Sequence, residues 1–169
     1  PSPNPIPRLF REAVGKPLQR SVGLRRHSSF QIGGPADYFF SASSVQELRD
    51  CLRFVRERSV PRYVIGAGTN LLFDDAGFRG MIIKNHIQGI HRKSAESVVE
   101  VMAGTPLADL VDLCLEEGRE GLEFAAGIPG TVGGAVYGNA GAWGSSIGHC
   151  LVEAALLDEA GQEIRVNNA

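Results

Sequence analysis

VIGAGTNLLFDDAGFRG occupies residues 64–80, and the expected fold is built outward from it. Its first two residues are β-branched and predict a short strand. Gly66 and Gly68 come next, and they free the backbone to turn sharply and to present successive N–H groups, an arrangement that suits an anion. Thr69 and Asn70 add side-chain donors without adding charge. This run therefore predicts a loop that holds a diphosphate through neutral hydrogen bonds.

Two familiar phosphate-loop motifs do not fit this sequence. A Walker loop needs Gly-Lys-Ser/Thr, whereas Gly68 is followed by Thr69 and Asn70. A Rossmann fingerprint needs a third glycine three residues after the second, but Leu71 stands there, and residues 74–77 indicate a turn instead of a helix. An ordinary strand followed by a glycine-rich turn stays open as an alternative. A second glycine-rich segment, described below, favours the phosphate loop.

Composition excludes several classes of protein. The 169 residues include 21 glycines, about 12% against an average near 7%, yet 43% are hydrophobic and no tract is of low complexity. The glycines are therefore expected in turns and close backbone approaches. A net charge of −2 and a pI of about 6.1 give no general attraction to nucleic acid or to an anionic membrane. No apolar run approaches the ~20 residues that cross a bilayer.

Cysteine usage points to a reducing compartment. Cys51, Cys114 and Cys150 are widely spaced, odd in number and without a Cys-x-x-Cys pair, which argues against a disulfide scaffold. We expect a cytoplasmic location, with the first two of these thiols in the core. Residues 1–17 lack the apolar middle of a signal peptide. Because the chain begins with Pro1, we expect that it was processed, trimmed or cut from a longer one.

The N-terminal residues 1–20 carry four prolines in the first seven positions, and we expect a loosely tied arm. Its basic residues favour a solvated face over a nucleic-acid patch, because no aromatic residues interleave with them. Residues 27–35 alternate apolar Phe30 and Ile32 before a Gly-Gly-Pro turn, and this pattern predicts a short strand ended by chain reversal.

A β-α-β unit is expected around the first glycine loop. Residues 36–41 predict a strand, and Ser44 with Glu47 forms a capping box. A helix follows with apolar residues on one face, namely Val45, Leu48, Cys51, Leu52 and Val55. Pro61 ends this helix, and residues 63–65 form the second strand. The loop then lies at the carboxyl end of that strand, where ligands of such units tend to bind.

We expect a boundary between two subdomains after a third short strand at residues 81–83. Residues 85–96 are polar and are expected to loop. The boundary assigns residues 21–85 to subdomain 1 and residues 86–169 to subdomain 2.

The second half repeats strand and helix as a pattern. Residues 98–102 predict a strand, and Thr105 and Pro106 suit the cap and first turn of a helix that Gly118 would end. Its apolar face comprises Leu107, Leu110, Val111, Cys114 and Leu115. Residues 151–166 predict a hairpin.

Residues 121–144 form the second glycine-rich segment. Eight glycines are spaced too closely for a regular element, and small apolar residues stand between them. A flexible linker would be rich in serine and would lack Ile128, Val132 and Trp143. The segment therefore predicts backbone pressed against a flat ligand. With the diphosphate loop, it suggests a dinucleotide lying across two subdomains.

Four ordered motifs resemble a known family. They are FQIGGPAD at residues 30–37, GAGTNLL at 66–72 with GFRG at 77–80, AGIPGTVGGA at 126–135, and NAGA at 139–142. In this order they are similar to the UDP-N-acetylenolpyruvoylglucosamine reductases, flavoenzymes of bacterial peptidoglycan precursor synthesis. The resemblance runs from about His27 to the C-terminus.

The resemblance implies an α+β fold, the two-subdomain FAD-binding fold of the PCMH and vanillyl-alcohol-oxidase type, with FAD held noncovalently between the subdomains. The diphosphate would be held by the first loop, namely Gly66, Ala67, Gly68, Thr69, Asn70 and Leu71. The flavin and ribityl region would be lined by a second set, namely Ala126, Gly127, Pro129, Gly130, Gly133, Gly134, Asn139 and Gly141.

The resemblance implies that hydride passes from NADPH to FAD and then from reduced FAD to the enolpyruvyl double bond of a UDP-sugar. A general acid would then protonate the carbanion-like centre that this step leaves. The family's catalytic Arg, Ser and Glu would lie beyond Ala169, so the resemblance assigns no catalytic residue to this chain. Gln31 stands where the family commonly has Arg, and Gly138 replaces a larger residue.

The sequence leaves other interpretations open. A binding or interaction module could keep the fold without turnover. The four histidines have no ligand-like spacing and no supporting acid or cysteine cluster, so we expect no metal site. His27 or His149 could hydrogen-bond a ligand, although a surface role is favoured. Tyr137 and Trp143 could line the flavin pocket or pack the glycine segment.

Overall fold

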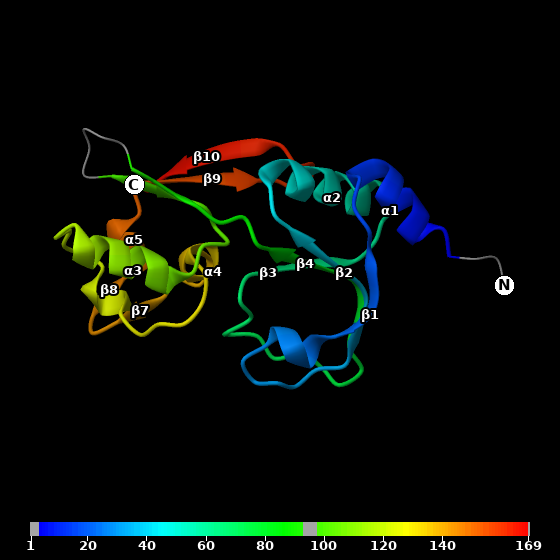
Figure 1. Ribbon diagram of the computed structural model, residues 1–169, viewed down its shortest axis with the longest axis horizontal. Coiled ribbons are helices and arrows are strands. Elements are labelled where there is room, and N and C mark those ends of the chain that lie inside the picture. The colour runs from blue at the N-terminus through cyan, green and yellow to red at the C-terminus, as the bar shows by residue number, and fades with distance from the viewer. Residues whose placement is uncertain (1–3, 93–97, 169) are drawn as a thin grey trace.

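The computed structural model describes residues 4–92 and 98–168, which form two lobes and a connecting hairpin (Figure 1). The first lobe comprises α1 (Ile6–Val14), β1 (Gln19–Gly23), the 3-10 helix η1 (Leu24–His27), β2 (Pro35–Ala42), α2 (Val45–Glu57), β3 (Arg62–Ile65) and β4 (Phe78–Asn85). The second lobe comprises β5 (Ile90–Arg92), β6 (Val99–Val101), α3 (Leu107–Glu116), the 3-10 helix η2 (Glu123–Ala125), α4 (Val132–Tyr137), β7 (Gly141–Ala142), β8 (Ser145–Ser146) and α5 (Ile147–Cys150). The hairpin comprises β9 (Glu153–Leu157) and β10 (Glu163–Asn167).

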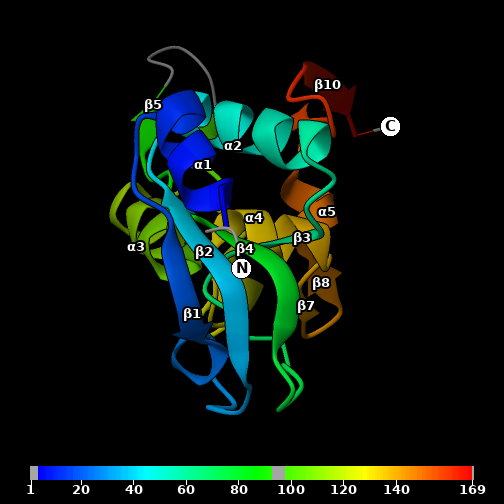
Figure 2. The ribbon, with the colours of Figure 1, turned by 90° about the vertical axis from the view of Figure 1, so that its right-hand side faces the viewer.

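A four-stranded sheet organises the first lobe, with strand order β1-β2-β4-β3. β2 and β3 each run parallel to β4, so β2, α2 and β3 form the expected β-α-β unit with β4 inserted between its strands. β1 is antiparallel to β2 at one edge. Helices α1 and α2 lie together over one face of this sheet (Figure 2). The glycine loop begins at the carboxyl end of β3, as expected.

Helix α2 begins where the sequence predicted, at Ser44. The Ser44 hydroxyl accepts a hydrogen bond from the Glu47 amide at 3.1 Å. The return bond of the expected capping box is displaced by one residue, because the Glu47 carboxylate accepts from the amide of Ser43 at 2.8 Å instead. That backbone bond is the main reason why the pKa of Glu47 is lowered. Both arrangements satisfy amides at the start of the helix.

Two hydrophobic cores lie on opposite faces of the sheet. The face under the helices packs Met81 and Ile83 of β4 against Cys51 and Val55 of α2. The other face packs a smaller group, namely Leu24, Ala36, Phe39, Ile65 and Ile82. No α-helix covers this second face in the described residues; Leu24 of η1 belongs to it, and Leu71 and Phe73, from the loop between β3 and β4, pack against it. The glycine loop is therefore part of the fold as well as a candidate site.

The N-terminal arm is more ordered than the sequence indicated. Residues 6–14 form α1, because prolines are tolerated in the first turn of a helix. Phe10 is fully buried, and its ring meets Phe40 and Phe54 edge-on at centroid distances of 5.0 and 5.2 Å. The expectation of a loosely tied arm over residues 1–20 was therefore wrong for this helix.

The short strand expected within residues 27–35 is also absent. Residues 24–27 form η1, and Gln31 adopts a φ of 56° in a turn, with its amide donating to the Ser28 carbonyl. Phe30 and Ile32 are about half exposed, at 56% and 49%. Their alternation was misleading because this segment bonds to the glycine loop and not to another strand.

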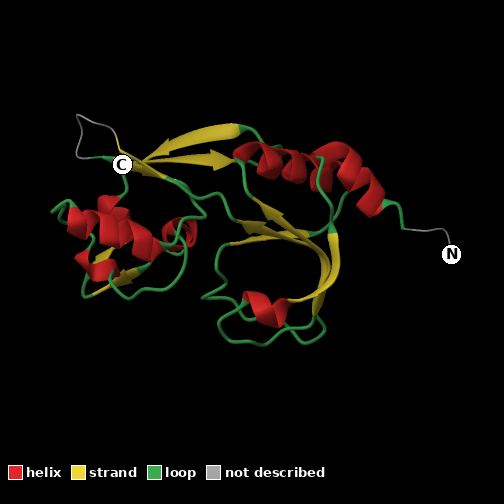
Figure 3. Ribbon diagram, in the orientation of Figure 1, coloured by secondary structure: helices red, strands yellow, loops and turns green. Residues whose placement is uncertain are grey.

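The second lobe is mostly helical (Figure 3), and it differs from the prediction at two points. Residues 90–92 form β5, paired with β6, where a polar loop was expected; residues 93–97 of that expected loop lie outside the described residues. The glycine segment contains helix α4, although the close spacing of its glycines predicted no regular element. The reason is close packing, since a Cβ on Gly133 would lie 2.7 Å from the Ala103 Cβ.

Helix α3 and the final hairpin follow the prediction closely. Pro106 occupies the N-cap position of α3 without a capping hydrogen bond, and the hydroxyl of Thr105, the expected cap, bonds to Gly89 instead. Gly118 follows the helix with a φ of +64°. The hairpin reaches back to the first lobe, where Leu157 packs against the α2 side of the sheet. Glu159 at its turn forms an ion pair with Arg62 at 3.0 Å.

The subdomain boundaries at residues 20/21 and 85/86 remain a prediction. Across residues 4–92 and 98–168, no helix combines the length and the apolar character that a membrane span requires.

Replacing Phe10 with Ala should lower the free energy of unfolding by about 3–5 kcal/mol, because a fully buried aromatic ring leaves a cavity. Urea unfolding of the variant and the unmodified chain measures this difference. Arg11→Ala, one residue along on the exposed side of the same helix, should change stability by no more than about 0.5 kcal/mol. Equal effects of both substitutions would show that α1 does not belong to the core.

The three thiols should react in a clear order. Burial raises the pKa of Cys51 to about 12 and also raises that of Cys114, whereas Cys150 is exposed. At about pH 8, a thiol reagent should therefore modify Cys150 fast and the other two only after denaturation. Because the Cys51 pKa is raised on folding, its contribution to stability is complete below the ordinary thiol pKa and falls as pH rises toward about 12. Rapid labelling of Cys51 in the folded chain would contradict this burial.

Candidate functional site

The carbonyl groups of the glycine loop are tied to the segment that follows η1. The Gly68 carbonyl accepts from the Ser29 amide at 3.2 Å, and the Thr69 carbonyl accepts from the Ser29 hydroxyl at 3.0 Å. The Leu71 carbonyl accepts from the Ser28 hydroxyl. Three hydrogen bonds therefore hold the carbonyl groups of residues 68, 69 and 71 against residues 28 and 29.

The amide side of the same loop is not used by the protein. None of the backbone N–H groups of residues 67–71 donates to another residue in the described parts of the chain. Buried amides are nearly always paired, so a run of unpaired amides marks either solvent or a ligand. Because the carbonyls face the serines, these amides are left to form a nest of donors.

Gly68 can be replaced by no other residue without rearranging the loop. Its φ is +75°, and a Cβ at this position would lie 1.9 Å from the carbonyl oxygen of His27. Both the left-handed conformation and the close approach exclude a side chain. Gly34 makes a similar approach, since its Cβ would lie 2.0 Å from the Asp75 carbonyl oxygen. These two contacts fix how the loop folds against residues 27–35.

The second glycine segment faces the first across the junction of the lobes. The Thr69 hydroxyl donates to the Pro129 carbonyl at 3.2 Å, and a Cβ on Gly66 would lie 2.3 Å from the Thr131 hydroxyl oxygen. The N–H groups of Gly130 and Thr131 donate to no other residue among those that the structure describes. Two sets of unused amides therefore come from opposite lobes.

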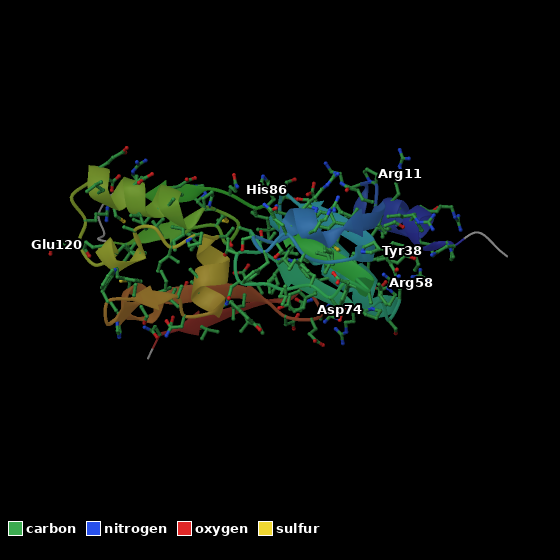
Figure 4. The ribbon with its side chains drawn as sticks, turned by 90° about the horizontal axis from the view of Figure 1, so that it is seen from below. Arg11, Tyr38, Arg58, Asp74, His86 and Glu120 are labelled. Carbon is green, nitrogen blue, oxygen red and sulfur yellow. The ribbon has the colours of Figure 1, made fainter. Side chains whose placement is uncertain are left out.

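A pocket of about 180 Å³ lies at this junction. It is lined by Ala67, Lys84, Asn85, His86, Gln88, Gly104, Pro106, Gly130 and Thr131. Figure 4 shows His86 where the two lobes meet. The pocket offers backbone donors from both glycine segments together with a lysine, and no carboxylate lines it. Such a set of groups suits a phosphorylated ligand.

The sequence pattern of the FAD binding domain matches residues 36–167, well over half of the chain. This chain belongs to the FAD binding domain family. The family agrees with the fold class that the motifs implied.

Curated relatives of this family member carry one name. A UDP-N-acetylenolpyruvoylglucosamine reductase of Chlamydia trachomatis serovar D is 42% identical over 144 residues, 85% of this chain and 49% of the relative. Reductases of the same name from Chlamydia pneumoniae and Clostridium botulinum are 40% and 38% identical over 86% and 85% of this chain. The chain spans about half the length of the curated relatives it matches.

Solved structures agree on the fold. The UDP-N-acetylenolpyruvylglucosamine reductase of Thermus caldophilus superposes with a TM-score of 0.72 and 28% identity, over 89% of this chain and 52% of that one. A glucose oxidase variant of Phl p 4 superposes with a TM-score of 0.66 and 11% identity, over 93% of this chain and 37% of that one. The second likeness supports the fold class alone.

The structure divides the residues predicted for the cofactor into two groups. Residues 66–71 lie across from Pro129 and Gly130, at or beside the pocket. Others make contacts that stabilise the fold of the second lobe itself. The Gly133 amide donates to the Ala103 carbonyl, and the Asn139 side chain accepts from the Gly148 amide at 3.0 Å. The role of every one of these residues in cofactor binding remains a prediction.

Sequence reasoning missed several residues at the junction. Lys84, His86 and Gln88 line the pocket because β4 ends beside the glycine loop. The sequence signal for them was their position just after a buried apolar strand. Tyr137 and Trp143 neither line this pocket nor pack the glycine segment, since they are 92% and 95% exposed.

His27 lies beneath the loop in a partly buried position. Its ring stacks on Phe39 at a centroid distance of 4.3 Å, and its Nδ1 atom is buried without a hydrogen-bond partner in the described residues. Burial is the main cause that lowers the pKa of His27, followed by the charges of Lys84 and Arg26. The ring therefore favours its neutral form beside the charges of Lys84 and Arg26.

Replacing Gly68 with Ala should destabilise the chain well beyond the cost of backbone strain alone. Gly127→Ala is a matched control, because that residue has a similar φ of +84° but no atom within 4 Å of a Cβ. The control should cost roughly 1–2 kcal/mol, the price of a left-handed alanine. Gly68→Ala should cost clearly more in urea unfolding, since the His27 carbonyl must also move. Equal costs would show that the loop is not pressed against residue 27.

Proposed function

We propose that this chain is the FAD-binding portion of an NADPH-dependent reductase that converts the enolpyruvyl group of UDP-N-acetylglucosamine enolpyruvate, giving UDP-N-acetylmuramate for peptidoglycan synthesis in the cytoplasm. The observation that carries the proposal is the pair of glycine segments whose unused amides meet at one pocket between the lobes. The names and identities of the curated relatives support the choice of substrate.

The residues present fit FAD at this junction. A Cβ on Gly66 would contact the Thr131 hydroxyl, and one on Gly130 would lie 3.0 Å from the Thr69 hydroxyl, so side chains would fill the space between the segments. Amides 67–71 would hold the diphosphate, and residues 126–134 would lie along the flavin and ribityl region. When bound, the cofactor supplies hydride transfer to and from carbon.

The role of this chain's own residues is then to bind and orient. The bonds from Ser28 and Ser29 and the close approach at Gly68 fix the loop amides before a ligand binds. Binding would therefore cost little further conformational entropy in this loop. We assign no proton donor for the substrate within these residues. The junction of the two lobes would also shield part of a bound ligand from water.

A second candidate function is supported by the exposed aromatic residues. Trp143 stands at the tip of the β7–β8 hairpin with 95% of its surface exposed, and Tyr137 ends α4 with 92% exposed. Large exposed aromatic side chains are typical of interaction surfaces. A binding module that keeps this fold without turnover would account for them.

An absorption spectrum and a melting curve, each with and without added FAD, test the proposal. We expect flavin absorbance to remain with the chain after desalting. We also expect FAD at about 100 times its dissociation constant to stabilise the fold by about 2.7 kcal/mol, because only the folded chain binds it. A chain that melts cooperatively, keeps no flavin and gains no stability would contradict FAD binding and favour the interaction module.

A further inference from the structure

Lys84 occupies an unusual place for a lysine, at the end of the central strand of the sheet. It pairs in register with Ile65, the residue that immediately precedes the glycine loop. Side chains at paired positions of neighbouring strands lie on the same face of a sheet. Ile65 packs in the core opposite α2, so Lys84 extends from the face that carries the glycine loop.

The charge of Lys84 has no carboxylate partner in the described parts of the chain, where ten ion pairs join other residues. The side chains that line the pocket with it, those of Asn85, His86 and Gln88, are not acidic. Lys84 lies near His27 and helps to lower the pKa of its ring. Lys84 is a partly buried residue, and a cation without a carboxylate partner in such a position favours an anion from outside the protein.

The same pocket holds the amides that the protein leaves unused. Ala67, Gly130 and Thr131 line it together with Lys84, and their backbone N–H groups donate to no described residue. Several neutral donors around one cation match the oxygens and the charge of a phosphate group. The net charge of −2 gives the chain no general affinity for polyanions, so this site is a local exception.

We propose that Lys84 is the cation that neutralises the diphosphate of the bound dinucleotide, in company with the loop amides. This inference rests on the proposed function, because it concerns the same ligand. It assigns the positive charge at the diphosphate to Lys84 of β4, because residues 66–71 of the glycine loop are uncharged. The ligand class is a nucleoside diphosphate group, and the flavin ring plays no part in this contact.

Fluorescence titration with FAD, riboflavin and ADP tests the assignment on the full chain. Lys84→Gln should weaken binding of FAD and ADP roughly 10-fold to 100-fold, the usual worth of a hydrogen bond to a charged group. Binding of riboflavin, which lacks phosphates, should be unchanged. The salt dependence of FAD binding should become smaller in the variant, and Lys84→Arg should restore part of the affinity.

Lys16→Gln is the matched control, since Lys16 pairs with Glu47 at 3.3 Å near α2 and does not line the pocket. It should bind FAD as the unmodified chain does. Equal FAD affinity and salt dependence in Lys84→Gln would overturn the inference and leave the proposed function intact, and so would equal losses for FAD and riboflavin. An unmodified chain that binds neither FAD nor ADP would overturn the proposed function itself. Matching far-ultraviolet circular dichroism and melting temperatures establish that the variants are folded.

Discussion

The parallel pairing of β3 with β4 is the constraint on which the rest of the structure depends. Parallel neighbours cannot be joined by a tight hairpin, so the chain must cross from one end of the sheet to the other. In this protein residues 66–77 make that crossing without a helix, and they cover the sheet face opposite α2. Leu71 and Phe73 supply the apolar contacts that a crossover helix would otherwise provide.

This crossing also decides which backbone groups of the loop are left without a protein partner. Ser28 and Ser29 bind three carbonyl groups of the loop, and the absence of side chains at Gly34 and Gly68 lets the two segments approach closely. The amides of residues 67–71 are left without a protein partner in the described residues. The same hydrogen bonds that complete the fold would therefore also prepare the proposed site, where an uncharged loop would hold an anion through its amides.

Strong local signals in the sequence were sufficient for α2, α3, the β-α-β unit and the final hairpin. They failed where tertiary contacts overrode local pattern. The prolines before Phe10 suggested a loose arm, although one buried aromatic ring holds α1 on the sheet. Closely spaced glycines suggested irregular backbone, yet α4 forms because Gly133 must pack against Ala103. The glycine loop itself was recognisable, but its carbonyl partners at residues 28 and 29 could not be known from spacing.

Charge is the part of the site that sequence reasoning could least anticipate. The loop has no lysine, and the pocket acquires one only because β4 returns beside β3 and ends at Lys84. A lysine placed on a strand is held more firmly than one carried on a loop, since the sheet fixes its backbone. In the proposed site, the glycine loops would supply many weak neutral donors and set the geometry, whereas one strand would supply the charge. Neither element alone would distinguish a phosphorylated ligand from any other small polar molecule.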